Sequence, residues 1–180
     1  GELLQELKAK GYEITVICPP DEKNAHYFTD LGIKLLTVPM SRKGTNIKED
    51  VQLVKNLFKV YKKEKFDLVF HYTIKPNIYG TLAAKLAGIK SIAITTGLGY
   101  VFLHNNITSL IAKFMYKFSL AFANEVWFLN DDDMNIFLDK DLITERQAFK
   151  LPSEGINTKR FVQKKKNRKD SKTVFLMIAR

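Results

Sequence analysis

Two hydrophobic patterns alternate along this chain of 180 residues. Short apolar runs bounded by Gly, Pro or Asn are typical of buried strands, and they occur at 12–18, 33–39, 67–72, 91–96, 125–130, 148–152 and 173–179. Between these runs, apolar residues recur at helical spacing, which predicts helices at 2–10, 22–31, 46–66, 77–88, 107–123 and 131–142. Glycines follow the first, second and fourth of these helices, as expected of helix ends.

Apolar strands that alternate with helices predict a parallel sheet covered by helices on both faces. We therefore expect an α/β fold with a Rossmann-like, doubly wound and mainly parallel sheet. In such sheets, ligands bind beyond the carboxyl ends of the strands, where loops lead into helix N-termini. The loops after strands 67–72 and 91–96 carry more polar and glycine residues than a connection needs, so they are the first candidates for a site.

The composition is that of a globular protein, with 46% hydrophobic and 12% aromatic residues. The net charge of +10 predicts attraction to an anionic partner, which is a nucleic acid, a phosphorylated substrate or a membrane surface. Part of this charge falls in KKKNRKD at 164–170, a run typical of a solvated linker. Elsewhere the basic residues lack the regular aromatic interleaving of a single-strand binder, so no nucleic-acid partner is expected.

Three features bear on the location of the protein. The single cysteine, Cys18, can form no internal disulfide, which suits a reducing cytoplasm. The first residues predict an amphipathic helix rather than a secretory leader. The longest apolar stretch, 107–123, is interrupted by Lys113 and Lys117 and falls short of the roughly 18–20 apolar residues that span a bilayer. We expect a cytoplasmic protein, with this helix either covering the core or touching an anionic membrane from the side.

The segment HYTIKPNIYG, residues 71–80, is the most constrained of the candidate loops. Pro76 fits the first turn of a helix, whose free N–H groups can face an anion, and Lys75 would add a positive charge beside them. A capped turn with an exposed lysine is the simpler alternative. His71 ends its strand at the same edge, where it would act as a base or bind a hydroxyl group, or else serve as a structural histidine that bonds a neighbouring loop.

Two further motifs have weaker claims to chemistry. Gly97 and Gly99 have the G-x-G spacing of a dinucleotide loop, but Phe102 occupies the position of the third glycine, so NAD binding is not expected. The motif Asp131-x-Asp133 binds a metal in one class of sugar transferases, yet here it opens a helix. Its position predicts a capped helix start rather than a metal site.

Taken together, four segments resemble one family of enzymes. The segment TIKPNIYGTLAAKLAGIKSIAITTGLGYVF at 73–102 is similar to the N-terminal domain of the retaining GT-B glycosyltransferases of family four. Those that build capsular or O-antigen polysaccharide, or glycans on undecaprenyl diphosphate, are the most similar. KGYEITVICPPDE at 10–22 resembles the second strand of that domain. KLPSEGINTKRF at 150–161 and VFLMIAR at 174–180 resemble its interdomain segment and the first strand of the second domain.

The resemblance implies transfer of a sugar from a nucleotide-sugar to a lipid-linked or polysaccharide acceptor, with retained anomeric configuration and with neither a metal nor another cofactor. It assigns acceptor binding to the N-terminal domain and donor binding to the C-terminal one. The residues that would border the acceptor are Lys75, Pro76, Gly97, Leu98, Gly99 and Tyr100. Arg180 matches an arginine that contacts the donor diphosphate, whereas Gly155 and Asn157 lie in the interdomain segment. His71 is a catalytic candidate by position alone.

The same resemblance predicts that the chain is divided into three parts. Residues 1–162 would form the acceptor-binding domain without its first strand, 163–172 a basic linker, and 173–180 the start of the donor domain. Such a piece is expected to be inactive by itself. An NAD-dependent oxidoreductase domain and a non-catalytic basic module for membrane or nucleic acid remain as alternatives.

One position in the predicted sheet has no strand to fill it. In this fold the first strand lies between strands 12–18 and 67–72, and leaving both unpaired there costs roughly 1–3 kcal/mol for each buried backbone group without a partner. We expect that residues upstream of this sequence fill the position, or that the strand at 173–179 does so in the same or a partner chain.

Overall fold

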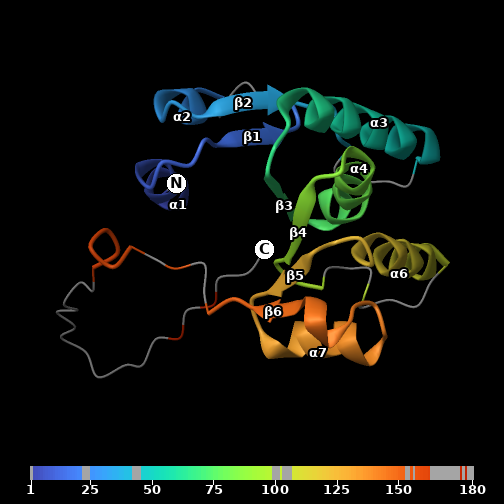
Figure 1. Ribbon diagram of the computed structural model, residues 1–180. Coiled ribbons are helices and arrows are strands. Elements are labelled where there is room, and N and C mark those ends of the chain that lie inside the picture. The colour runs from blue at the N-terminus through green and yellow to red at the C-terminus, as the bar shows by residue number, and fades with distance from the viewer. Residues whose placement is uncertain are drawn as a thin grey trace.

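The computed structural model describes residues 2–21, 25–41, 46–98, 102, 107–152, 155, 157–162, 175 and 177. It is an α/β structure in which strands and helices alternate (Figure 1). The elements are α1 (Glu2–Ala9), β1 (Thr15–Cys18), α2 (Ala25–Asp30), β2 (Lys34–Thr37), α3 (Ile47–Glu64), β3 (Leu68–Tyr72), η1 (Pro76–Gly80), α4 (Thr81–Ala87), β4 (Lys90–Thr95), α6 (Ile107–Leu120), β5 (Glu125–Phe128), α7 (Asp131–Asp139), η2 (Glu145–Gln147) and β6 (Ala148–Lys150). This order confirms the predicted fold class.

The strands form two parallel sheets rather than one. β1 pairs with β2, and the second sheet has the order β3-β4-β5-β6, parallel throughout. We call α1, β1, α2 and β2 the amino-terminal layer, and we call the second sheet with α3, α4, α6 and α7 the four-stranded body. Figure 1 shows α3 and α4 beside β3 and β4, with α6 and α7 further along the sheet, next to β5 and β6.

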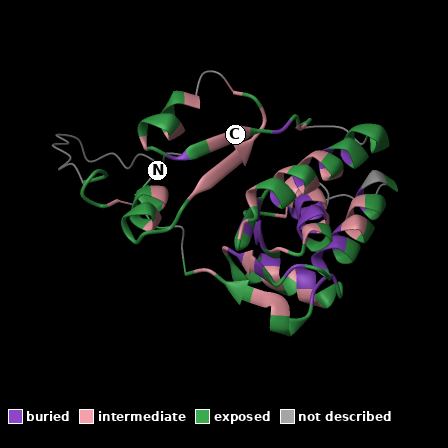
Figure 2. Cartoon of the chain, turned by 45° about the horizontal axis from the view of Figure 1, so that its top comes forward, coloured by how far each residue is buried: buried purple, intermediate pink, exposed green. Residues whose placement is uncertain are grey.

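The apolar faces of the four-stranded body form two clusters. One joins α6 and α7 to the sheet through Tyr116, Leu120, Val126, Phe128 and Phe137, all of them buried. The other joins α3 and α4 to β3, and it includes Leu53, Leu57, Tyr61, Val69 and Ala83. The buried residues drawn in purple in Figure 2 concentrate in this body. The strand register places Val69, Ala93, Val126 and Phe128 on the same face of the sheet, so both clusters cover that one face.

Local sequence explains where two helices begin. The Asn46 side chain accepts a hydrogen bond of 3.1 Å from the backbone N–H of Lys48 at the start of α3. Asn130 does the same for α7, where its Oδ1 accepts a bond of 2.7 Å from the N–H of Asp133. Because Asn130 caps the helix and the aspartates lie in its first turn, the Asp131-x-Asp133 motif is a helix start, as expected. Among the described residues, no group of three or more His, Cys, Asp or Glu side chains is arranged to hold a metal.

The position between β1 and β3 is open. A cavity of about 250 Å³ lies between residues 13–17 and residues 68–72, and no hydrogen bond of the sheets joins the two strands. Phe175 and Met177 are 92% and 87% exposed and lie outside any strand, so neither of these two residues fills the position. The expectation that residues upstream of this sequence fill the position stays a prediction, and both β1 and β3 form within the described residues. Each keeps one paired neighbour and the helices that pack on it.

Candidate functional site

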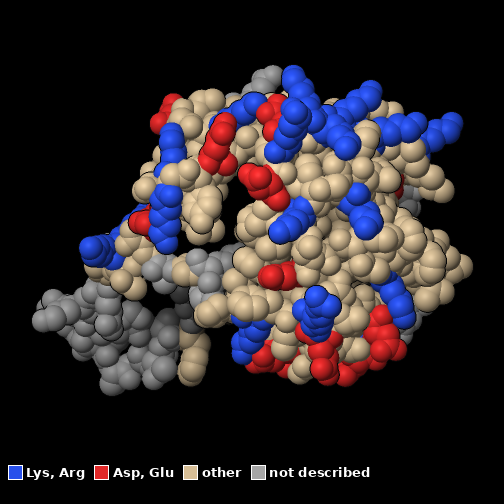
Figure 3. Space-filling model, viewed as in Figure 1, with Lys and Arg blue, Asp and Glu red and all other residues tan. Residues whose placement is uncertain are grey.

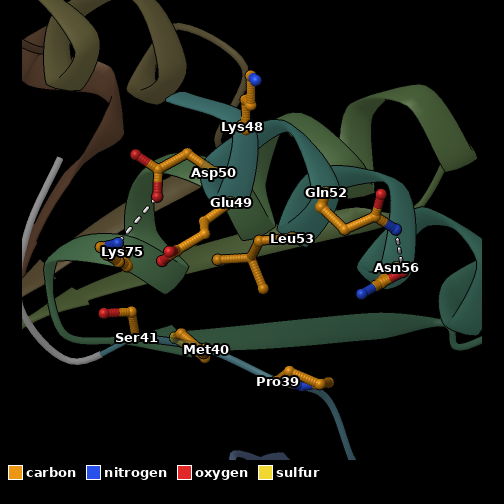
Figure 4. Close-up of a pocket in the computed structure, with 10 residues that line it drawn as sticks. All are labelled: Pro39, Met40, Ser41, Lys48, Glu49, Asp50, Gln52, Leu53, Asn56 and Lys75. Carbon is orange, nitrogen blue, oxygen red and sulfur yellow. Dashed lines mark hydrogen bonds and ion pairs between the residues drawn. The ribbon is translucent and has the colours of Figure 1, made fainter. Parts of the chain in front are cut away.

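A cavity of about 360 Å³ lies where the loops after β2 and β3 meet the first turns of α3 (Figure 4). Met40 and Ser41 come from the loop after β2, and Lys75 comes from the loop after β3. Asp50 and Leu53 project from α3. The cavity therefore lies at the carboxyl ends of two parallel strands, which is where an open α/β sheet binds its ligands.

Lys75 is held in the cavity wall by a buried carboxylate. Its Nζ donates to Oδ1 of Asp50 at 2.8 Å, and the hydroxyl of Tyr79 donates to Oδ2 of the same residue at 2.7 Å. Only 16% of the Lys75 side chain and 10% of the Asp50 side chain are exposed. Burial, and then the hydrogen bond to Asp50 and the charge of that carboxylate, raise the pKa of Tyr79 well above its ordinary value. Tyr79 therefore keeps its proton and serves as a fixed donor.

The rest of the wall offers two amides, a hydroxyl, a second ammonium group and the carboxylate of Glu49. Gln52 donates to Asn56 at 2.8 Å along the exposed side of α3, and Lys48 and Glu49 also line the cavity. An ammonium group has three N–H donors, of which the bond to Asp50 uses one on Lys75. Amides, a hydroxyl and ammonium groups around a half-open cavity suit a ligand with sugar hydroxyls and phosphate oxygens.

His71 lies behind this site, in the interior. Its Nε2 is 3.0 Å from the Tyr61 hydroxyl, its Nδ1 is 3.2 Å from the Thr81 hydroxyl, and only 3% of the residue is exposed. Burial lowers the pKa of His71 to about 4, so the ring is neutral at pH 7. Gly80 is required for this arrangement, because a Cβ atom there would lie 2.6 Å from the His71 ring. The geometry describes a structural histidine, and a catalytic role for His71 stays a prediction.

The loop between His71 and α4 is more constrained than the sequence indicates. Thr73 adopts a positive φ of 72°, which is strained for a residue with a branched Cβ. Pro76 does open a helical turn, but η1 is π-helical rather than α-helical. Asn77 is buried and donates to the Ile94 carbonyl at 3.1 Å, which fastens the turn to β4. This fixed turn sets where Lys75 points.

The loop after β4 is only partly described. Gly97 is exposed with φ of 149°, a conformation that favours glycine, whereas Leu98 packs against the core cluster beside Phe102. Leu98 therefore faces the interior rather than the cavity at Lys75. Gly99 and Tyr100, both expected at the acceptor, lie outside the described residues.

The interdomain candidates lie far along the chain from the site. Gly155 has a positive φ of 76°, and Asn157 accepts a bond from the N–H of Lys159 at 2.9 Å, so each residue shapes a turn. The Asn157 side chain also donates to Glu2 at 2.8 Å. Arg180 lies outside the described residues.

Sequence reasoning missed Asp50 and Tyr79, the two partners that position Lys75. Asp50 looked like an ordinary acidic residue in the first turn of a helix. Its burial was not visible because it depends on how α3 crosses the loop after β3. An acidic residue near the start of one helix and a lysine at the exit of a strand were the available signals.

Comparisons with known proteins find related sequences. The family described as Glycosyl transferase 4-like matches residues 2–130, which include the cavity and the β3 loop. The chain is 30% identical to an N,N'-diacetylbacillosaminyl-diphospho-undecaprenol alpha-1,3-N-acetylgalactosaminyltransferase of Campylobacter jejuni, over 99% of this chain and 51% of that protein. It is 24% identical to an Escherichia coli UDP-Gal:alpha-D-GlcNAc-diphosphoundecaprenol alpha-1,3-galactosyltransferase, over 83% of this chain and 38% of that protein.

A solved structure supports the fold. HepE of Anabaena, in complex with UDP, superposes with a TM-score of 0.63 at 15% identity, over 88% of this chain and 42% of that one. The chain thus spans about half, or less, of the length of these relatives. Neither an oxidoreductase nor a basic binding module is favoured by these matches. The family match extends over more than half of the chain, and the chain therefore belongs to the glycosyl transferase 4-like family.

Proposed function

We propose that this chain is the acceptor-binding part of a glycosyltransferase that moves a sugar from a nucleotide-sugar to an undecaprenyl-diphosphate-linked or polysaccharide acceptor, with retention. The observation that carries the proposal is the cavity at the carboxyl ends of β2 and β3, built within the family match. Two relatives are named for transfer to undecaprenol-linked sugars, which supports an acceptor of this kind. The amides, hydroxyl and ammonium groups of the wall suit its sugar and phosphate groups.

In this proposal, each element of the site has a binding task. Lys75 contacts an acceptor phosphate or hydroxyl, and Asp50 and Tyr79 hold its ammonium group in place. Pro76, Gly97, Leu98, Gly99 and Tyr100 border the acceptor or shape the loops around it. Arg180 contacts the donor diphosphate, and the segment with Gly155 and Asn157 leads to a donor-binding domain. No metal or other cofactor takes part, and the leaving phosphate assists the attack on the sugar.

The proposal extends to where the protein acts. An acceptor on a polyprenyl lipid is presented at a membrane surface, and the net charge of +10 favours an anionic one. We place the enzyme on the cytoplasmic face of the membrane, as a peripheral protein in a pathway for capsular or related polysaccharide. Within the described residues, no helix is long and apolar enough to cross a bilayer.

Steady-state kinetics on the full-length protein test the proposal. The substrates are UDP-sugars and an undecaprenyl-diphosphate-linked acetamido sugar, and the variant is Lys75→Ala. Loss of one charge-assisted hydrogen bond should raise the acceptor KM about tenfold or more and leave the donor KM unchanged. Lys90→Ala is the matched control, because Lys90 is an exposed lysine at the amino end of β4, away from the cavity.

The outcomes separate the parts of the proposal. If none of the UDP-sugars tried supports turnover, the proposed transfer from a UDP-sugar is refuted. A Lys75→Ala effect on the donor KM alone would move the acceptor away from this cavity. Retention is read from the anomeric configuration of the product by NMR. Residues 1–180 by themselves are expected to give no turnover.

A further inference from the structure

The cavity at Lys75 has two ends of different chemistry. One end, near the start of α3, holds the charged pair in which Asp50 fixes Lys75 (Figure 4). The other end is lined by residues further along α3 and by residues of the loop after β2, namely Pro39, Met40, Gln52, Leu53 and Asn56. We call these residues the amide end of the cavity. The proposed function gives this end no task.

One side-chain amide at the amide end is oriented and still has donors to offer. Nε2 of Gln52 donates to Oδ1 of Asn56 at 2.8 Å, one helical turn away. This bond orients the Asn56 amide and uses its oxygen, so its nitrogen keeps two N–H donors. In Figure 4 that nitrogen points toward the loop with Pro39 and Met40. Asn56 therefore presents a donor, and not an acceptor, on that side.

An apolar wall lies beside this donor. Leu53 is a buried residue of the cluster that joins α3 to β3, Met40 packs against that cluster, and both residues line the cavity. In Figure 4 the Leu53 side chain points toward the segment that carries Met40. A methionine side chain adapts to the shape of a small apolar group. The amide end can therefore bury such a group next to the N–H donors of Asn56.

Few parts of a lipid-linked sugar match both properties. A phosphate needs a cation, but Lys75 lies at the other end and Lys48 points away from Asn56 in Figure 4. A hydroxyl group would bond the amide but leave Leu53 and Met40 against a polar group. A polyprenyl chain would cover the apolar wall but leave the amide without an acceptor. An acetamido group supplies a carbonyl oxygen for the amide and a methyl group for the wall.

We propose that the amide end binds an acetamido group of the acceptor sugar, with Asn56 donating to its carbonyl oxygen and with its methyl group against Met40 and Leu53. Asn56 is then a specificity-determining residue, because a sugar with a hydroxyl group at the same carbon leaves the apolar wall unfilled. Lys75 and the amide end together fix the orientation of the sugar. The inference rests on the proposed function, since it requires the acceptor in this cavity.

Isothermal titration calorimetry of the full-length protein tests this specificity and needs no donor. The probes are short-chain prenyl diphosphates that carry N-acetylglucosamine or glucose, which differ only in the acetamido group. The variant is Asn56→Asp, whose carboxylate still accepts from Gln52 but cannot donate. We expect the wild-type protein to bind the acetamido probe about tenfold or more tightly than the glucose probe, and Asn56→Asp to lose most of this preference.

Two further variants separate the amide from its surroundings. Asn135→Asp is the matched control, because Asn135 is exposed on α7, away from the cavity, and undergoes the same change. It should keep the affinity for each probe within about twofold of the wild-type value. Met40→Gln should weaken binding of the acetamido probe about fourfold, the effect of about one buried methyl group, with little change for the glucose probe.

Three results would overturn the inference. They are equal affinity of the wild-type protein for the two probes, an unchanged preference in Asn56→Asp, and an equal loss of preference in Asn135→Asp. Binding of neither probe would overturn it together with the acceptor cavity. An acetamido preference without any sugar transfer would instead contradict the proposed function alone. If Asn56→Asp does not fold by circular dichroism, Asn56→Ala replaces it, because alanine also removes the donor and favours a helix.

Discussion

The amino-terminal layer and the four-stranded body use the same alternation of strands and helices, yet they bury their residues to different degrees. Neither α1 nor α2 has a buried residue, and all four positions of β1 are only half-buried. In the body, five of the six residues of β4 are buried. β4 has a paired strand on each side, whereas β1 has one neighbour and the open position.

This contrast shows that an apolar pattern is buried only as far as its neighbours allow. β3 stands on the other side of the open position, and three of its side chains, Leu68, Phe70 and Tyr72, are 40–45% exposed. The candidate site draws on both regions, because its wall includes the loop after β2 as well as α3 and Lys75. The body supplies the rigid part of the wall, and the amino-terminal layer supplies the more weakly packed part.

The largest difference in stability between the two regions is expected when a single aromatic residue in each is replaced by alanine. Phe137 is fully buried against the rings of Phe128, Tyr116 and Phe102, so Phe137→Ala should lower the free energy of unfolding by about 3–5 kcal/mol. Phe28→Ala in α2 should cost clearly less, since Phe28 is only half-buried. Urea denaturation of both variants checks the order. Equal losses would show that the amino-terminal layer is packed as firmly as the body.

A pH dependence of stability is expected to arise in the body. The pKa of His71 is about 4 in the folded protein and about 6.5 in the unfolded chain, so the unfolded state binds more protons as the pH falls through this window. The contribution of His71 to the free energy of unfolding is complete above pH 6.5 and declines toward pH 4. It falls by about 2 kcal/mol between pH 7 and pH 5. When the free energy of unfolding is measured against pH, His71→Gln should remove this part of the slope, whereas His26→Gln in the amino-terminal layer should keep it. A slope unchanged in His71→Gln would contradict the assignment.

Smaller losses of stability are expected when two ion pairs, one buried and one near the surface, are broken. Asp50 is buried with Lys75 inside the body, so Asp50→Asn should cost about 1–3 kcal/mol by leaving the ammonium group without its partner. Lys34 and Glu64 join β2 to α3 near the surface, where Glu64→Gln should cost less than about 1 kcal/mol. Thermal unfolding at low and high salt distinguishes the two, because salt screens the exposed pair more strongly. A larger loss of stability for Glu64→Gln than for Asp50→Asn would mean that the Lys34–Glu64 pair, and not packing, holds the amino-terminal layer.

Much of the fold could be predicted from sequence, because local patterns determine it. The order of strands and helices, the Asn130 cap and the loop with Lys75 and Pro76 all follow from residues close together in the chain. The final strand at 173–179 was not confirmed at Phe175 and Met177, which lie outside any strand. The other residues of 173–179 lie outside the described part of the chain.

The candidate site was less predictable, because it depends on contacts between distant residues. Asp50 and Lys75 are 25 residues apart, and their pairing requires α3 to cross the loop after β3. Both roles remained open for His71 until Tyr61 of α3 was placed beside its ring. Leu98 is partly buried against the core cluster, and its place at the acceptor stays a prediction. Such outcomes follow from tertiary packing, which neither periodicity nor motif spacing encodes.

The central claim is that the acceptor binds in the cavity between the loops after β2 and β3. Hydrogen–deuterium exchange of the full-length protein, with and without a short-chain prenyl-diphosphate sugar, tests it most directly. The account predicts slower exchange in residues 38–41, 47–56 and 73–80 on binding, and no change in α1 or α2. Slower exchange confined to the amino-terminal layer, or to segments outside these three, would contradict it.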